Sequence, residues 1–145
     1  MFGPVTLEIS EGWLVALVGP EQSGRTSLLL TLAGRMDPSA GTVDVLGHRL
    51  PHGRRLVHRH TALAGFDGID TLDEGLTVAE LLQERADLSV PLWRRPLRVG
   101  DERMAELART VFGPDAPDLD TQVWHLSALQ TFQLRLLIAL VGAPT

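Results

Sequence analysis

The sequence predicts an α/β fold that carries a helical insert. A short apolar run, Trp13–Val18, leads into a glycine-containing loop and then a leucine-rich segment, Thr26–Arg35, an order typical of strand, loop and helix. A strand-like stretch at Thr42–Leu46 and a second apolar run at Thr61–Phe66 continue the pattern of chains that mix strands and helices. From Thr77 onward, apolar residues recur at helical spacing instead.

Composition narrows the possible function classes. With 145 residues and 44% hydrophobic content, the chain is long enough for one core. A net charge of −5 gives no global positive field, so neither nucleic acid nor an anionic membrane surface is expected as a partner. The absence of cysteine fits a reducing compartment, and we expect a cytoplasmic location. We see no leader at the N-terminus, and the apolar stretch 134–141 contains Arg135 and is too short to span a membrane.

The first half of the chain predicts a β-hairpin and then a βα unit. Residues Val5–Ile9 alternate apolar and polar side chains, and Glu11-Gly12 forms a turn before the Trp13–Val18 strand, which we expect to be buried. The helix that follows the loop is expected to stop at Gly34. Gly47–Gly53 is rich in turn residues.

The second half predicts helices with clear start signals. Thr77 with Glu80 three residues later is a capping box, and Asp101 begins another helix, which Gly113-Pro114 ends. A proline-rich connector, 91–96, joins the two helices. A last helix is expected from Ser127 to about Val141.

The loop after the first buried strand matches a phosphate-binding pattern. Gly19 and Gly24 stand at the spacing of G-x-x-x-x-G-K-[ST], and Thr26 occupies the hydroxyl position that supplies a ligand to Mg²⁺. Small glycines let backbone N–H groups close around a phosphate, and the helix start that follows favours an anion. The alternative is an ordinary tight turn between a strand and a helix. The residues predicted to bind the phosphates are Gly19, Pro20, Gln22, Ser23, Gly24, Arg25, Thr26 and Ser27.

Three substitutions within this loop depart from the phosphate-binding pattern: Arg25 predicts altered catalytic placement of the charge, and Glu21 and Gln22 predict weakened phosphate binding. Arg25 stands where the pattern has lysine, and all 13 basic residues of the chain are arginine, so no lysine elsewhere replaces it. Arginine keeps the charge but moves it, because its guanidinium is longer, planar and forked. Glu21 adds a carboxylate, and Gln22 fills a position where a small residue is expected.

The order of motifs resembles the front half of an ATP-binding cassette (ABC) transporter ATPase. The phosphate loop is followed by Leu76–Glu80, by a helical insert, and by Leu126–Gln130, which is similar to that family's Leu-Ser-Gly-Gly-Gln signature. The resemblance covers nearly the whole chain. It implies a partial α/β P-loop NTPase fold of ABC type, with a core and N-terminal hairpin at 1–75, a helical subdomain at 76–126 and a signature helix at 127–145.

Departures from the family pattern put the ATPase cycle in doubt. Ala128 and Leu129 replace the two signature glycines, and Ser127 with Gln130 is itself a capping box, so the segment equally fits a simple helix start. No glutamine lies between Gln22 and Gln83, where the family carries a Mg²⁺ ligand. The family's carboxylates and switch histidine belong to a stretch beyond Thr145. We expect Phe2 to be a poor adenine-stacking residue.

The resemblance therefore implies an ATP-binding subunit, or part of one, that couples ATP binding to transport. ATP and Mg²⁺ are the implied ligands, with Leu126, Ser127 and Gln130 as signature-like residues and Thr26 as the metal ligand. The implied partners are a transmembrane permease subunit and a second nucleotide-binding subunit, at the inner face of the cell membrane. The alternative is a non-hydrolysing pseudo-ATPase with a regulatory or scaffolding role. A P-loop kinase is disfavoured by the order of the motifs.

Three weaker signals favour ordinary structural roles. A basic cluster between His48 and His60 is more simply a solvated hairpin than a phosphate or zinc site, because its histidines lack ligand spacing. The acidic loop formed by Asp67, Asp70, Asp73 and Glu74 lacks the pattern of a calcium loop. Trp93 and Trp124 are expected in the core or, as the resemblance implies, at a surface that meets a membrane subunit.

Overall fold

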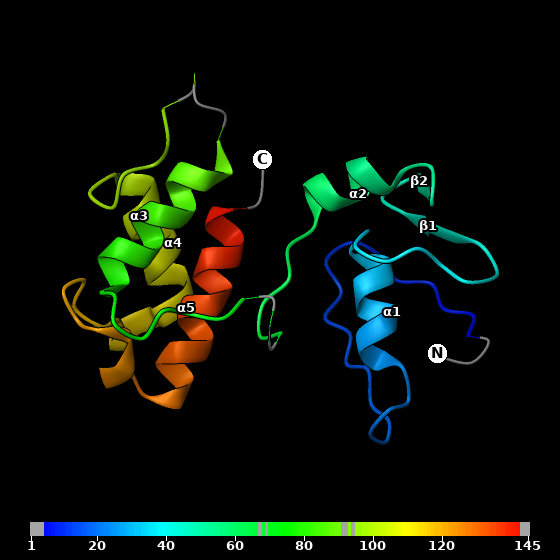
Figure 1. The fold of residues 1–145 in the computed structure, drawn as a ribbon, viewed down its shortest axis with the longest axis horizontal. Helices are drawn as coiled ribbons and strands as arrows, with labels where there is room; N and C mark the ends of the chain where they lie inside the picture. The colour runs from blue at the N-terminus through cyan, green and yellow to red at the C-terminus, as the bar shows by residue number, and fades with distance from the viewer. Residues whose placement is uncertain (1–4, 67, 69, 91–92, 94, 143–145) are drawn as a thin grey trace. The chain divides into compact units, whose positions relative to one another are not determined.

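A computed structural model describes residues 5–66, 68, 70–90, 93 and 95–142 and divides the chain into two compact units, Met1–Thr61 and Ala62–Thr145. The first, unit 1, contains strands and helices, and the second, unit 2, is helical (Figure 1). None of the helices in the described ranges has both the length and the apolar character needed to cross a membrane.

Unit 1 is built around one helix, one hairpin and a second short helix. Helix α1 spans Arg25–Leu32, strands β1 (Val43–Val45) and β2 (His48–Leu50) pair antiparallel, and helix α2 spans Arg54–His60. In the pairing, Val43 lies opposite Leu50 and Val45 opposite His48. The buried residues that hold these elements together are Thr31, Ala33, Leu50 and Val57.

The end of α1 packs tightly on α2. A Cβ atom on Gly34 would lie 3.0 Å from both the Arg54 carbonyl oxygen and the His58 nitrogen, so only glycine allows this approach. The φ angle of Gly34 is +67°, which glycine adopts without strain. Beside it, the Arg35 guanidinium donates to the Ala33 carbonyl at 2.8 Å and to the Thr61 hydroxyl at 3.1 Å. These contacts fix the C-terminal end of α1 against the last residue of unit 1.

The predicted N-terminal hairpin and buried strand are wrong for the described residues. Residues 5–18 form no strand, and Leu14 and Val18 are 101% and 92% exposed. The predicted turn at Glu11-Gly12 is present, because the Trp13 N–H donates to the Ser10 carbonyl. The apolar run pairs with neither β1 nor β2, the strands described in unit 1, which bond only to each other in the described ranges.

Two other sequence predictions for the first 66 residues also need correction. Thr61–Phe66 forms no strand. The basic segment is not simply a solvated hairpin, because the hairpin ends at Leu50 and residues 54–60 are helical. Arginine and histidine gave this segment no apolar periodicity, and Val57 is its buried residue.

Unit 2 is a bundle in which one helix packs on two others. Helix α3 spans Val78–Ser89, α4 spans Glu102–Phe112 and α5 spans Ala128–Val141, with short 3₁₀ turns η1 (Gly113–Asp115) and η2 (Val123–His125). Helix α5 lies against both α3 and α4 (Figure 1). The buried core consists of Val78, Leu81, Leu82, Ala86, Met104, Phe112, Val123, Leu134, Leu137 and Val141.

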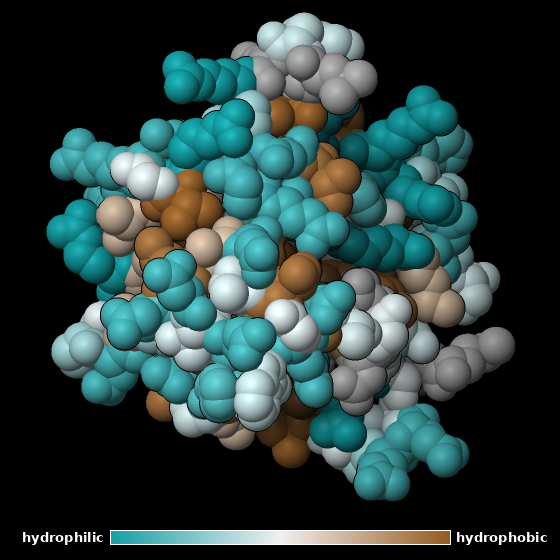
Figure 2. Space-filling model, turned by 60° about the vertical axis from the view of Figure 1, so that its left-hand side comes forward, coloured by the Kyte–Doolittle hydropathy of each residue, from teal (hydrophilic) through white to brown (hydrophobic). Residues whose placement is uncertain are grey.

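The predicted helix starts and stops of unit 2 are confirmed. Thr77 and Glu80 form the expected capping box, Asp101 is the N-cap of α4, and Gly113 follows its last residue. The prediction that Trp93 and Trp124 lie in the core is wrong, because they are 86% and 59% exposed. Apolar side chains do reach the surface among hydrophilic ones on the face shown in Figure 2.

Candidate nucleotide-binding site

The predicted phosphate loop leads directly into α1. Gly24 is the N-cap of the helix and has φ 84° and ψ 11°, a left-handed conformation that favours glycine. Gln22 also has a positive φ, 61°, and the Ser23 N–H donates to the Pro20 carbonyl at 3.3 Å. The loop thus turns tightly and ends at Gly24, directly before the helix. Helix α1 begins at Arg25, one residue before the predicted start at Thr26.

The backbone at the start of α1 offers several unused donors. The first helical bond of this end is donated by the Leu28 N–H to the Gly24 carbonyl, at 2.9 Å. Within the described part of the chain, the N–H groups of residues 24–27 have no acceptor, and no side chain caps the helix. The first turn also carries no acidic residue. Such a helix end attracts an anion, because its free amides and its dipole both present positive charge.

The Ser23 hydroxyl adds a further unpaired group to this loop. Its oxygen is shielded from solvent and has no hydrogen-bond partner among the described residues. A Cβ atom on Gly19 would lie only 2.9 Å from Ser23 Oγ and 3.8 Å from Arg25 Cδ. The missing side chain of Gly19 therefore leaves room for this hydroxyl and for the arginine stem. Buried polar atoms normally have partners, so a lone one here fits a bound anion.

The remaining predicted residues lie around this helix start. Pro20, Gln22, Arg25 and Thr26 are exposed, and Ser27 is partly buried. The Ser27 carbonyl accepts a hydrogen bond from the Thr31 hydroxyl at 2.8 Å. The Thr26 hydroxyl has no protein partner in the described ranges. It is therefore available to a Mg²⁺ ion whose other ligands would be phosphate oxygens and water. The described residues contain no group of three or more metal-ligating side chains.

The signature-like segment begins α5 in unit 2. Ser127 is the N-cap, its hydroxyl accepts from the Gln130 N–H at 3.2 Å, and the Gln130 side chain accepts from the Ser127 N–H at 3.0 Å. Gln130 also donates to the Asp115 carbonyl. Leu126 is partly buried, and Leu129 is 63% exposed in the first helical turn. The predicted capping box is confirmed, so both polar side chains already serve the start of this helix.

The weaker candidate residues have local partners. The Asp70 carboxylate accepts from the Phe66 N–H at 2.8 Å and from the Gly65 N–H, and Arg135 lies 3.8 Å away. Asp73 accepts from the Gly75 N–H. These carboxylates organise their own loop. Asp67 and Phe2 lie outside the described residues.

One histidine of the basic segment has a lowered pKa. Burial, together with the positive charges of Arg35 and Arg54, lowers the pKa of His58. The imidazole is therefore held toward its neutral form. This interaction was not predictable from the sequence, because Arg35 lies 23 positions before His58.

The fold is similar to that of a solved structure. A solved chain titled as the ATP-binding subunit of an ABC transporter is similar to 86% of this chain, with a TM-score of 0.56 and 19% identity, and this chain covers 48% of it. At that identity the likeness shows the fold alone, and it confirms the predicted partial α/β P-loop NTPase fold.

The family is shown by sequence. The ABC transporter family model matches residues 2–145, so the chain belongs to the ABC transporter family. A Methanopyrus kandleri relative, whose name places it among ABC transporter ATP-binding proteins, is 32% identical over 96% of this chain and 48% of its own length. A hemin import ATP-binding protein of Nocardia farcinica is 41% identical over 43% of this chain and 24% of its own length. The chain thus spans at most about half of these relatives.

Proposed function

We propose that this chain binds ATP at the start of α1 and serves as the phosphate-binding part of an ABC transporter's nucleotide-binding subunit. The observation that carries the proposal is the Ser23 hydroxyl, which directly precedes the N–H groups of residues 24–27 and, like them, has no hydrogen-bond partner among the described residues. Family membership supports it, since the relatives above are named as ATP-binding proteins.

Each predicted loop residue has a role in this proposal. The amides of residues 24–27 and the Ser23 hydroxyl would donate to phosphate oxygens, and Gly19 and Gly24 give the loop its close approach. Arg25 would bring a positive charge to the outer phosphates, and the Thr26 hydroxyl would hold Mg²⁺. The ion would neutralise phosphate charge when bound.

The working partners belong to the same proposal. A transmembrane permease subunit and a second nucleotide-binding subunit fit the family, as does a place at the cytoplasmic face of the membrane. Nucleic acid is not among the proposed partners. A non-hydrolysing regulatory role is the second candidate, and the exposed Leu129 at the start of α5 favours it, because a leucine there obstructs close approach of a phosphate.

Two glycine substitutions test the site. Gly19→Ala places a methyl group 2.9 Å from Ser23 Oγ and should displace it, whereas Gly100→Ala meets nothing within 4 Å and is the matched control. Neither glycine has a positive φ, so backbone strain is not the difference between them. Titration calorimetry with Mg-ATP should show binding by the wild type and Gly100→Ala and a loss of about tenfold or more in Gly19→Ala.

The proposal fails if the wild type does not bind ATP, or if Gly19→Ala binds as tightly as the control. Thermal unfolding of both variants separates a local effect from misfolding. A serine can rotate away from the new methyl group, so the melting temperatures should stay close to that of the wild type.

A further inference from the structure

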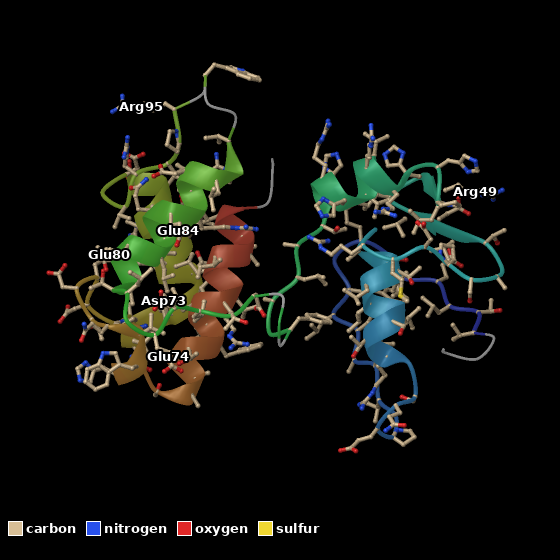
Figure 3. All side chains as sticks on the ribbon, viewed as in Figure 1. Arg49, Asp73, Glu74, Glu80, Glu84 and Arg95 are labelled. Carbon is tan, nitrogen blue, oxygen red and sulfur yellow. The ribbon has the colours of Figure 1, made fainter. Side chains whose placement is uncertain are left out.

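Positive charge is concentrated on β2 and α2, although the whole chain carries a net charge of −5. The segment His48–His60 holds four arginines and four histidines and no acidic residue. Two of the arginines pair with carboxylates elsewhere in unit 1. Arg49 lies 3.2 Å from Asp44 and projects outward from β2, and Arg54 lies 3.3 Å from Asp37 (Figure 3).

The other two arginines have no such partner. Arg55 and Arg59 are exposed, and neither makes an ion pair or side-chain hydrogen bond with any residue in the described ranges. They lie four positions apart on α2, so they share one face, and the buried Val57 lies on the opposite side. Like charges at this spacing repel each other. Contacts within unit 1 therefore give no structural reason for placing Arg55 and Arg59 on the same face of α2.

Exposed leucines accompany these arginines. Leu56 is 41% exposed on α2, and Leu46 is 63% exposed at the turn between β1 and β2. Leu46 has φ 51° and Gly47 has φ 77°, a pair of positive values for which Asn-Gly is the favoured sequence. A leucine there is strained and also leaves its apolar side chain in solvent. Turn geometry therefore gives no reason for this residue.

The leucine turn lies beside the start of α2. A Cβ atom on Gly53, the N-cap of α2, would be 2.7 Å from the His48 Cβ, and His48 follows the turn residue Gly47 directly. Leu46, two residues before His48, is therefore part of the hairpin that packs against the N-terminal end of α2, the end that carries Arg55 and Leu56. We call the set Leu46, Arg55, Leu56 and Arg59 the basic-apolar surface.

We propose that the basic-apolar surface binds a membrane that contains anionic lipids. The guanidinium groups of Arg55 and Arg59 would pair with headgroup phosphates, and the two leucines would enter the boundary between headgroups and acyl chains. A soluble acidic peptide would use the arginines but leave the leucines without a role. Nucleic acid is disfavoured because residues 46–60 contain no tryptophan, tyrosine or phenylalanine on which a base could stack. The proposal does not depend on nucleotide binding, since none of these residues belongs to the phosphate loop.

Vesicle flotation measures this binding directly. The protein should float with phosphatidylcholine vesicles that contain phosphatidylserine but not with phosphatidylcholine alone, and added salt should weaken the association. Arg55→Gln with Arg59→Gln should reduce binding about twenty-five-fold, from about fivefold for each arginine near an anionic surface. The matched control is Arg98→Gln with Arg103→Gln, which removes the same charge from two exposed arginines of unit 2.

A leucine variant tests whether apolar insertion contributes to vesicle binding in addition to the attraction between arginines and anionic headgroups. Leu46→Asn should weaken vesicle binding and at the same time raise the melting temperature, because asparagine tolerates the turn's positive φ. The proposal is overturned by equal binding to neutral vesicles, by an equal loss in the control pair, or by unchanged binding of Leu46→Asn. It is also overturned if poly-glutamate or a single-stranded oligonucleotide binds to the wild type and vesicles do not.

Discussion

Arg25 is the residue at which the phosphate loop departs most from its pattern. Its Cδ atom lies 3.8 Å from the position that a Gly19 Cβ would take, so its aliphatic stem lies beside Gly19. Lysine would place a compact ammonium charge near the same amides, whereas arginine spreads its charge over a planar fork. The backbone donors of residues 24–27 are the same in either case.

Arg25→Lys should therefore tighten ATP binding, by about three- to tenfold, because a compact charge fits between the outer phosphates. Glu21→Asn should act in the same direction, because it removes a carboxylate from the loop. Calorimetric titration of the two variants and the wild type measures both effects. Weaker binding by Arg25→Lys would show that the arginine is an adapted ligand.

At the scale of elements, the predictions that succeeded depend on neighbouring residues alone. The starts of α3 and α5 were visible as capping boxes, in which a side chain bonds a backbone N–H three positions away. The start of α1 was visible through Gly24. The residues of the phosphate loop were predictable for the same reason, but the unpaired Ser23 hydroxyl was not, because it depends on the three-dimensional closeness of Gly19.

The failed predictions concern elements that need distant partners. The run Trp13–Val18 is apolar enough for a buried strand, yet a strand forms only where another strand supplies hydrogen bonds. Helix α2 was missed because one buried residue, Val57, gives no periodic signal. An apolar pattern shows that a segment could be buried, but it does not show whether another part of the fold packs against that segment.

The capping box of α3 predicts a pH dependence of stability. The backbone N–H and the hydroxyl of Thr77 donate to the Glu80 carboxylate and lower its pKa from the ordinary value of 4.5. This contribution is fully present above that value and is lost as the pH falls through the lower pKa of the folded state. Glu80→Gln keeps the cap but does not titrate, so its melting temperature should fall less on acidification than that of the wild type.

Glu84, one turn further along α3, provides the control, since its side chain makes no hydrogen bond with the residues described (Figure 3). Glu84→Gln should leave the acid dependence of the melting temperature unchanged. A Glu80→Gln profile that follows the wild type at every pH would contradict the prediction.

At the scale of the molecule, the features of a nucleotide-binding protein are present without a full set of catalytic groups. Among the described residues, the amides at the start of α1 have no acceptor, and the first turn of α1 carries no acidic residue. No glutamine lies between Gln22 and Gln83. Phosphoryl transfer relies on groups that position water and neutralise charge.

The 145-residue chain should therefore release no phosphate from ATP above a blank, even where calorimetry shows binding. A colorimetric phosphate assay with and without Mg²⁺ is the measurement. Arg25→Ala serves as the control for contaminating activity, since contamination would be unaffected by the substitution. Steady Mg²⁺-dependent release that Arg25→Ala abolishes would contradict the prediction.

The close approach of Gly34 to α2 determines which sequences this fold can tolerate. In a saturation mutagenesis screen for folded protein, position 34 should accept no residue but glycine, because any Cβ atom would lie 3.0 Å from two backbone atoms of α2. Gly12 and Gly41 have similar positive φ angles but meet nothing within 4 Å, so asparagine should survive at both. Recovery of alanine at position 34 would contradict this expectation. Substitutions should therefore accumulate at the exposed glycine turns of unit 1 and be excluded where a glycine touches a neighbouring segment, as Gly34 does.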